Sequence, residues 1–129
     1  MREPIWVLKQ TVLVFHLEQL AEHGGSDGLR DEGLLESALA KPKNKFAYQP
    51  EITLAALAAS YAFGIARNHP FVDGNKRAAL VTAETFLELN GYIVEASKEA
   101  KYLNFIRLAD GSLTEVQLAK WYAEHLISL

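Results

Sequence analysis

Apolar side chains recur every three or four residues along most of this chain, which is the spacing that gathers them on one face of an α-helix. The pattern predicts helices over residues 9–23, 31–41, 53–69, 75–90 and 97–109, and a last helix that starts at residue 114. Residues 92–96 are expected to form a short extended link. We therefore predict an all-α fold, a single-domain bundle of about six helices over residues 1–129.

Capping and breaking residues set the expected helix boundaries. Gly24 and Gly25 end the first helix, Asp31 caps the second, and Pro42 is expected to stop it. Residues 43–50 contain cations and aromatics without a helical period, so they are expected to be non-helical. The stripes expected to face the core include Leu13, Leu17, Leu20 and Ala21 in the first helix, Leu57, Ala58, Tyr61, Ala62 and Ile65 in the third, Leu103, Ile106 and Ala109 in the fifth, and Leu118, Trp121, Tyr122 and Leu126 in the last.

Composition narrows the class of protein. The chain has 129 residues and no cysteine, which excludes disulfides and thiolate chemistry and fits a reducing cytoplasm. Its net charge of −3 argues against general nucleic-acid binding, which needs a basic face. The apolar run near the start lacks the features of a signal peptide, and no stretch has the length of a membrane span.

The chemistry is concentrated in residues 69–77, His-Pro-Phe-Val-Asp-Gly-Asn-Lys-Arg, between the third and fourth predicted helices. Pro70 should end the third helix, and Gly74 permits the tight turn that starts the fourth. Lys76 and Arg77 then fall in a first helical turn, where the free backbone N–H groups attract an anion. Cations oppose the helix dipole at this position, which indicates that the site serves a ligand.

Each residue of this motif has a structural and a functional interpretation. His69 is interpreted as a general base, because a base near neutral pH is what a hydroxyl nucleophile needs, whereas His16, His23 and His125 are interpreted as structural. Phe71 is expected to be a structural anchor in the core. Asp73 either closes the turn with Gly74 or binds Mg²⁺ beside a phosphate. Asn75 either caps the helix or orients phosphates, and Lys76 and Arg77 either lie on the surface or bind phosphate oxygens.

The motif resembles the signature of the Fic/Doc family. The Fic form reads His-Pro-Phe, two variable residues, then Gly-Asn-Gly-Arg, and the Doc form has lysine for the second glycine. His69, Phe71, Asp73, Asn75, Lys76 and Arg77 match the Doc form, whereas Pro70 and Gly74 match the Fic form. The length and the helix order also suit a Doc-type protein.

The resemblance implies a bacterial cytoplasmic toxin of a toxin–antitoxin pair. Its activity would be that of an ATP-dependent protein kinase that phosphorylates a threonine of elongation factor Tu and blocks translation. His69 would be the catalytic base, Asp73 would hold Mg²⁺, and Gly74, Asn75, Lys76 and Arg77 would bind the nucleotide phosphates.

The resemblance also implies partners. A small Phd-like antitoxin would bind a groove on the chain, and we expect neither nucleic-acid nor membrane binding. Residues 43–50, with Lys45, Phe46 and Tyr48, are either a solvated connector or a flap that docks the target protein. Many Fic proteins carry an inhibitory motif of Ser or Thr, three residues and Glu, which is absent from this sequence.

Two alternatives stay open at this point. One is an enzyme that transfers AMP, or another part of a nucleotide, to a protein hydroxyl. The other is a catalytically inactive helical module that binds proteins. Binding of a nucleotide with Mg²⁺ would separate both enzymes from the inactive module.

Overall fold

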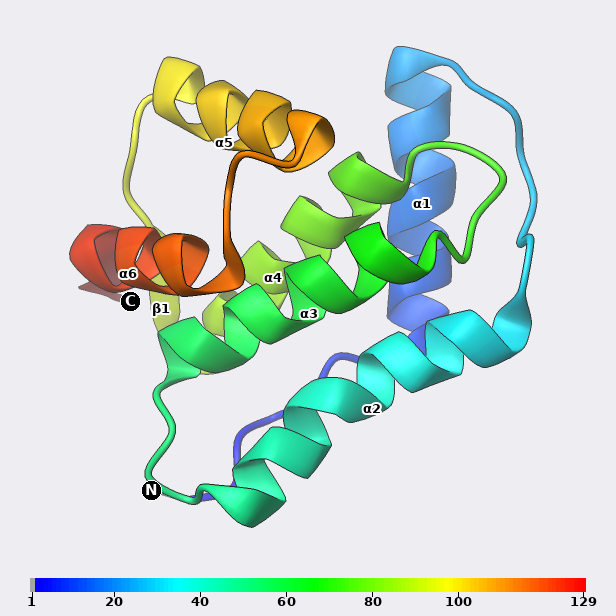
Figure 1. Cartoon of the computed structure of the whole chain (residues 1–129). Coiled ribbons are helices and arrows are strands. Elements are labelled where there is room, and N and C mark those ends of the chain that lie inside the picture. Colours follow the sequence, from blue (N-terminus) through cyan, green and yellow to red (C-terminus); the bar gives the residue numbers. More distant parts are fainter. Residues whose placement is uncertain (1) are drawn as a thin grey trace.

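The computed structural model describes residues 2–129, and these residues form six α-helices and a two-stranded sheet. The elements are α1 (Lys9–His23), α2 (Glu32–Tyr48), α3 (Leu54–Asn68), α4 (Asn75–Leu89), β1 (Tyr92–Val94), α5 (Lys98–Asp110), α6 (Glu115–His125) and β2 (Leu126–Ser128). Helix α3 lies at the centre, between α2 on one side and α4 on the other, and α6 lies across its N-terminal half (Figure 1). The prediction of an all-α bundle is confirmed.

The central position of α3 follows from its small side chains. Ala58, Ala59 and Ala62 are fully buried, and Thr53 caps the helix by accepting a hydrogen bond from the backbone N–H of Ala56. A Cβ added at Gly64 would lie 3.3 Å from backbone and side-chain atoms of Ala38 in α2. The absence of side-chain bulk here lets neighbouring helices approach closely on several faces of α3.

The predicted end of the second helix at Pro42 is wrong, because α2 continues through Pro42 to Tyr48. Proline removes one backbone hydrogen bond, but contacts further along the helix compensate for it. Pro42 itself is buried, Phe46 packs edge-on against the Trp6 ring at 5.9 Å, and Lys45 forms an ion pair with Glu115 of α6. Tertiary packing therefore keeps the chain helical beyond Pro42.

The predicted inward face of the first helix is right only in part, since Leu13 packs against the core but Ala21 is exposed. The structure buries Val12 and His16, whereas Leu17 is 52% exposed. Helix α1 crosses the start of α4 (Figure 1), and the His16 ring stacks on Phe71 with 3.8 Å between ring centroids. That aromatic contact turns the side of α1 that carries Val12 and His16 toward the core.

The fifth helix shows the same kind of error. Asn104 and Leu108 are buried, but the expected core residues Leu103 and Ile106 are 53% and 41% exposed. In the last helix Leu118 and Tyr122 are buried as expected, whereas Trp121 is half-buried and Leu126 belongs to β2. The buried face of α4 includes Ala78, Ala79, Thr82 and Phe86.

A small sheet closes the bundle and was missing from the predicted fold. The extended link after α4 becomes β1, and the chain leaves α6 to pair with it as β2 in antiparallel register, with Ile93 opposite Ile127. The Asn90 side chain ties the N-terminal segment to the same corner, because its Oδ1 accepts from the Ile5 N–H at 2.8 Å and its Nδ2 donates to the Ile5 carbonyl at 2.9 Å.

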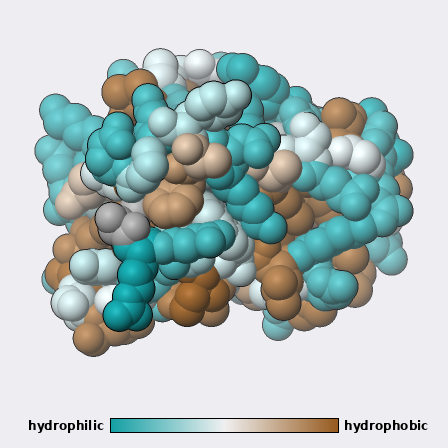
Figure 2. Space-filling view, turned by 90° about the horizontal axis from the view of Figure 1, so that it is seen from below, coloured by the Kyte–Doolittle hydropathy of each residue, from teal (hydrophilic) through white to brown (hydrophobic). Residues whose placement is uncertain are grey.

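The surface mixes hydrophilic and hydrophobic residues. Figure 2 shows one face on which small hydrophobic groups are separated by hydrophilic side chains. Within residues 2–129, no helix combines the length and the apolar character that crossing a membrane requires.

Candidate functional site

The loop between α3 and α4 carries the motif, and its entry is a strained residue. His69 follows the last residue of α3 with φ 51° and ψ 54°, a left-handed conformation that costs a non-glycine residue about 1–3 kcal/mol. Its backbone N–H still donates to the Ile65 carbonyl at 3.1 Å. The helix therefore ends where Pro70 predicted, with an exposed imidazole at the entrance of the loop.

Asn75 holds this loop from inside. Its Oδ1 accepts from the Phe71 N–H at 2.9 Å, and its Nδ2 donates to the Phe71 carbonyl at 3.0 Å. The same Nδ2 lies 3.1 Å from His69 Nδ1. Asn75 is 4% exposed and does not cap α4, whose N-cap residue is Gly74. Its amide thus orients the loop and the imidazole from the protein side.

This network predicts that Asn75→Ala destabilises the fold. The substitution leaves the Phe71 N–H and carbonyl without partners in a buried loop, so we expect the free energy of unfolding to fall by about 2–4 kcal/mol. Urea denaturation followed by circular dichroism measures this change. Ser97→Ala is the matched control, since it removes one exposed helix cap and should cost roughly 1 kcal/mol. Equal losses in both variants would contradict the role assigned to Asn75.

Two stacked aromatic rings, those of Phe71 and His16, support the motif loop. Phe71 is 1% exposed and its ring is nearly parallel to the His16 ring, at an interplanar angle of 8°. His16 is itself buried, and its Nε2 donates to the Asp73 carbonyl at 2.7 Å. The structural interpretation of His16 agrees with this placement, although its link to the motif loop had no signal in the sequence.

The His69 imidazole faces two cations. Its Nε2 lies 2.8 Å from Lys76 Nζ, and its pKa is lowered from the ordinary value by desolvation first, then by the positive charges of Lys76 and Arg30. The lowered pKa favours the neutral form of the His69 imidazole. A neutral imidazole has a lone pair on one nitrogen, so the Asn75 and Lys76 donors compete for it.

The start of α4 has the properties of an anion site. Among the described residues no side chain caps this helix, and Gly74 turns into it with φ 77°. A cavity of about 180 Å³ opens here, lined by His69, Val72, Asp73, Gly74, Asn75, Lys76, Arg77 and Phe105. The Arg77 guanidinium lies 4.8 Å above the Phe105 ring of α5, which holds it beside the cavity.

Asp73 contributes a carboxylate to the same cavity. Its Oδ1 accepts from the Gly74 N–H at 2.8 Å, as a turn residue does, and its Oδ2 lies 3.4 Å from the Ser26 N–H. Within residues 2–129 no cluster of three or more His, Cys, Asp or Glu side chains is arranged for a metal. One exposed carboxylate beside a phosphate site still fits Mg²⁺, which takes few protein ligands and completes its shell with phosphate and water.

The extended segment beside the site is not the predicted one. Residues 24–31, between α1 and α2, run antiparallel to the motif loop, with Leu29 bridged to Phe71 and the N–H groups of Arg30 and Asp31 donating to the Pro70 carbonyl. A Cβ at Gly25 would lie 2.8 Å from the Asp73 carboxylate, so the segment closely approaches the loop.

The segment proposed as a flap lies elsewhere. Lys45, Phe46 and Tyr48 belong to the last turns of α2, and none of them lines the cavity around His69. Lys45 and Tyr48 line a separate hollow near Ile52, and Tyr48 is 88% exposed. The description of residues 43–48 as a non-helical segment is therefore corrected to helix.

A second cavity adjoins the first and shares Lys76 with it. It measures about 360 Å³ and also takes in Phe63 and Arg67 of α3 and the start of α6 at Glu115. Arg67 lies outside the motif at residues 69–77, so the sequence alone does not assign it to the site. The structure places it beside Lys76 at the end of α3.

Comparison with known proteins places this fold and loop in a family. The profile of the Fic/DOC family matches residues 6–87, which includes α1 to α3, most of α4 and the whole motif. The chain belongs to the Fic/Doc family.

Its curated relatives specify the branch. The sequence is 33% identical over 90 residues to "Protein kinase doc" of Escherichia phage P1, a match that covers 70% of this chain and 71% of the relative. It is 44% identical over 69 residues to "Toxin Doc" of Mycolicibacterium smegmatis, covering 53% of each chain. Within the family the chain is thus a Doc-type toxin.

Proposed function

We propose that this toxin is an ATP-dependent protein kinase that phosphorylates a threonine of elongation factor Tu in the bacterial cytoplasm and so blocks translation. The observation that carries the proposal is the arrangement at the start of α4. An uncapped helix N-terminus, two cations and a neutral histidine share one small cavity. That combination suits a phosphoryl group and a base that acts on a hydroxyl.

The reaction divides among the residues as follows. His69 Nε2 takes the proton of the target hydroxyl, whose oxygen bonds to the γ-phosphorus of ATP, while the bond to the β–γ bridging oxygen breaks and ADP leaves. Lys76 and Arg77, with the backbone N–H groups of the first turn of α4, hold phosphate oxygens. Asn75 acts on the geometry of His69 and the loop, not on phosphate.

The metal has one protein carboxylate available in this cavity. Asp73 would hold Mg²⁺, which neutralises phosphate charge when it is bound with the nucleotide. The backbone bonds to Gly74 and Ser26 fix the carboxylate toward the start of α4.

Partners of two kinds complete the proposal. A Phd-like antitoxin, encoded separately, would bind a groove on the toxin and silence it, consistent with a chain that carries no internal inhibitory motif. The target protein would approach residues 24–31, since this segment runs beside the motif loop. Lys45, Phe46 and Tyr48 lie in the last turns of α2, outside the cavity around His69, and docking of the target on them stays a prediction.

Titration calorimetry with ATP and MgCl₂ tests the site. We expect wild-type protein to bind Mg·ATP and Arg77→Ala to bind it at least ten-fold more weakly, because a charge-assisted phosphate contact is lost. Arg2→Ala is the matched control, as Arg2 lies in a different hollow near the N-terminus. Absence of binding in the wild type would favour the inactive helical module, and equal binding by Arg77→Ala would remove Arg77 from the site.

One observation supports a second candidate activity. Gly74, in the left-handed conformation at the N-cap of α4, matches the Fic form of the motif. The second candidate is accordingly an AMP transferase that acts on a protein hydroxyl. The identity of the transferred group separates the two, and Lys76 is the residue that decides it.

A further inference from the structure

Arg30 makes an unusual set of contacts with the backbone that carries His69. Its Nε donates to the His69 carbonyl at 2.7 Å, and its Nη2 donates to the Asn68 carbonyl at 2.9 Å. These two carbonyls are at the C-terminal end of α3, where the helix itself supplies no N–H donor for them. The rigid, planar guanidinium thus binds the two successive peptide units that flank the Cα of His69.

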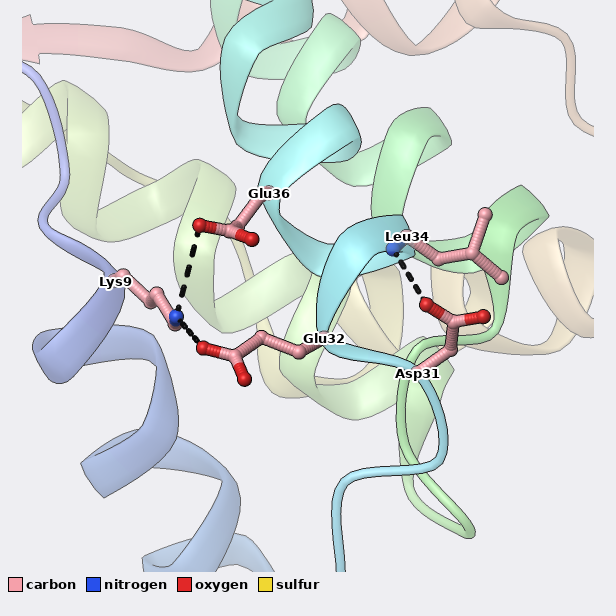
Figure 3. Close-up of polar contacts among 5 residues, drawn as sticks. All are labelled: Lys9, Asp31, Glu32, Leu34 and Glu36. Carbon is pink, nitrogen blue, oxygen red and sulfur yellow. Dashed lines mark hydrogen bonds and ion pairs between the residues drawn. The ribbon is translucent and has the colours of Figure 1, made fainter.

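Arg30 is itself fixed from both sides. Its backbone N–H donates to the Pro70 carbonyl at 2.7 Å, and the next residue, Asp31, caps α2 by accepting from the Leu34 N–H at 3.0 Å (Figure 3). Lys9 of α1 binds Glu32 at the start of the same helix and lies 3.8 Å from Glu36 (Figure 3). The guanidinium therefore extends from an anchored helix start.

The contacts of Arg30 hold the strained backbone of His69. A left-handed, non-glycine residue before a proline needs its surroundings to hold it in place. The Asn68 side chain adds one more tie, since its Nδ2 donates to the Leu34 carbonyl of α2 at 2.9 Å. The peptide units on both sides of the His69 Cα are thus bound to the segment that leads into α2.

We propose that Arg30 is a positioning residue for His69, whose forked bonds to the Asn68 and His69 carbonyls aim the imidazole at the cavity. The inference rests on the proposed function, in which His69 is the base. Arg30 is absent from the lining of the cavity around His69, so its effect on transfer passes through the histidine.

The charge of Arg30 adds a second, separable effect. The charged groups that face the imidazole are Lys76 from α4 and Arg30 from residues 24–31, and both lower its pKa in addition to desolvation. A lysine at position 30 would keep the charge without the fork, whereas a glutamine would lose both. The two substitutions therefore distinguish electrostatics from positioning.

The test uses full-length Arg30→Gln and Arg30→Lys, with Arg2→Gln as a matched exposed control. His69 is followed by NMR of histidine-labelled protein through a pH titration, with no nucleotide present. Phosphate transfer is measured separately with ATP and purified elongation factor Tu, at a temperature at which circular dichroism shows each variant folded.

We expect kcat to fall about 10- to 100-fold in Arg30→Gln, with a smaller change in KM for ATP, because a base displaced by about 1 Å loses this much. The pKa of His69 should rise in Arg30→Gln and stay lowered in Arg30→Lys, while kcat falls in both. Arg2→Gln should match the wild type in both measurements.

Unchanged His69 resonances and kcat in Arg30→Gln would overturn the inference. So would a loss of stability without any change in the His69 signals of the folded variant, since that is the behaviour of a simple helix cap. If the wild type transfers no phosphate, the proposed kinase fails by itself, and the His69 titration still decides whether Arg30 positions the imidazole.

Discussion

Replacing His69 with alanine should abolish the growth arrest that expression of the wild-type chain causes. In the proposed function the imidazole, whose pKa is lowered, is the general base, and removing a general base lowers transfer roughly 10²- to 10⁴-fold. His69→Tyr should have the same effect. Colony counts after induction measure the phenotype, and ³²P transfer from labelled ATP to purified elongation factor Tu measures the chemistry.

The variant should stay folded, because the His69 side chain is exposed and the loop is held by Asn75 and Phe71. His23→Gln is the matched control, since that histidine lies on α1 with Glu22 as its charged neighbour. It should kill as the wild type does. A folded His69→Ala protein that still arrests growth would remove the general-base role.

The acid limb of the rate profile gives an independent check. The folded-state pKa of His69 is lowered, so the base stays deprotonated, and transfer stays active, at pH values somewhat below the ordinary histidine range. Co-expression of a cognate antitoxin should restore growth. The toxin purified by itself should still show this pH profile. A limb displaced above the ordinary histidine value would contradict the electrostatic environment of the site.

Local signals in the sequence predicted most helix boundaries. Asp31, Thr53, Ser97 and Thr114 each accept a hydrogen bond from a backbone N–H of the helix that follows, and each cap depends on neighbours within three residues. The motif loop is equally local, because Pro70 and glycine bound it. Candidate chemistry within nine consecutive residues could therefore be found without knowledge of the fold.

Tertiary contacts decided what the sequence could not. Phe46 packs on Trp6 and keeps α2 helical past Pro42, across 40 residues of sequence. The rotation of α1 depends on the stacking of the His16 ring on Phe71, and the spacing of apolar residues does not predict that contact. Arg30 has no motif around it, and its bonds to His69 depend on how residues 24–31 run past the loop.

Lys76 should determine which part of ATP is transferred. Its Nζ lies 2.8 Å from His69 Nε2, at the start of a helix where the Fic form of the motif has glycine. A glycine there leaves room for a phosphate against the backbone, whereas lysine fills that space with its side chain. The nucleotide should then bind with its γ-phosphate, and not its α-phosphate, nearest the base.

The experiment uses ATP labelled separately at the α and γ positions, with purified elongation factor Tu as the acceptor and cell extract as a second source of targets. We expect label from the γ position alone in the modified protein. Lys76→Gly should lose at least 100-fold in kinase activity, because it removes a phosphate-binding charge from the cavity. The matched control is Lys43→Met, at an exposed position of α2, and it should stay active. Methionine is chosen because a glycine at this position would alter helix α2.

The same substitution changes the base in a measurable direction. Removing the Lys76 charge should raise the pKa of His69, and it frees Nε2 from a donor that competes with the Asn75 amide for the one lone pair of the neutral ring. In the wild type we therefore expect the ammonium to leave Nε2 before a target hydroxyl approaches it, and we expect the phosphates of ATP to draw it away. Transfer of α-label by the wild type would mean that Lys76 does not set the orientation, and that the chain is an AMP transferase with an atypical motif.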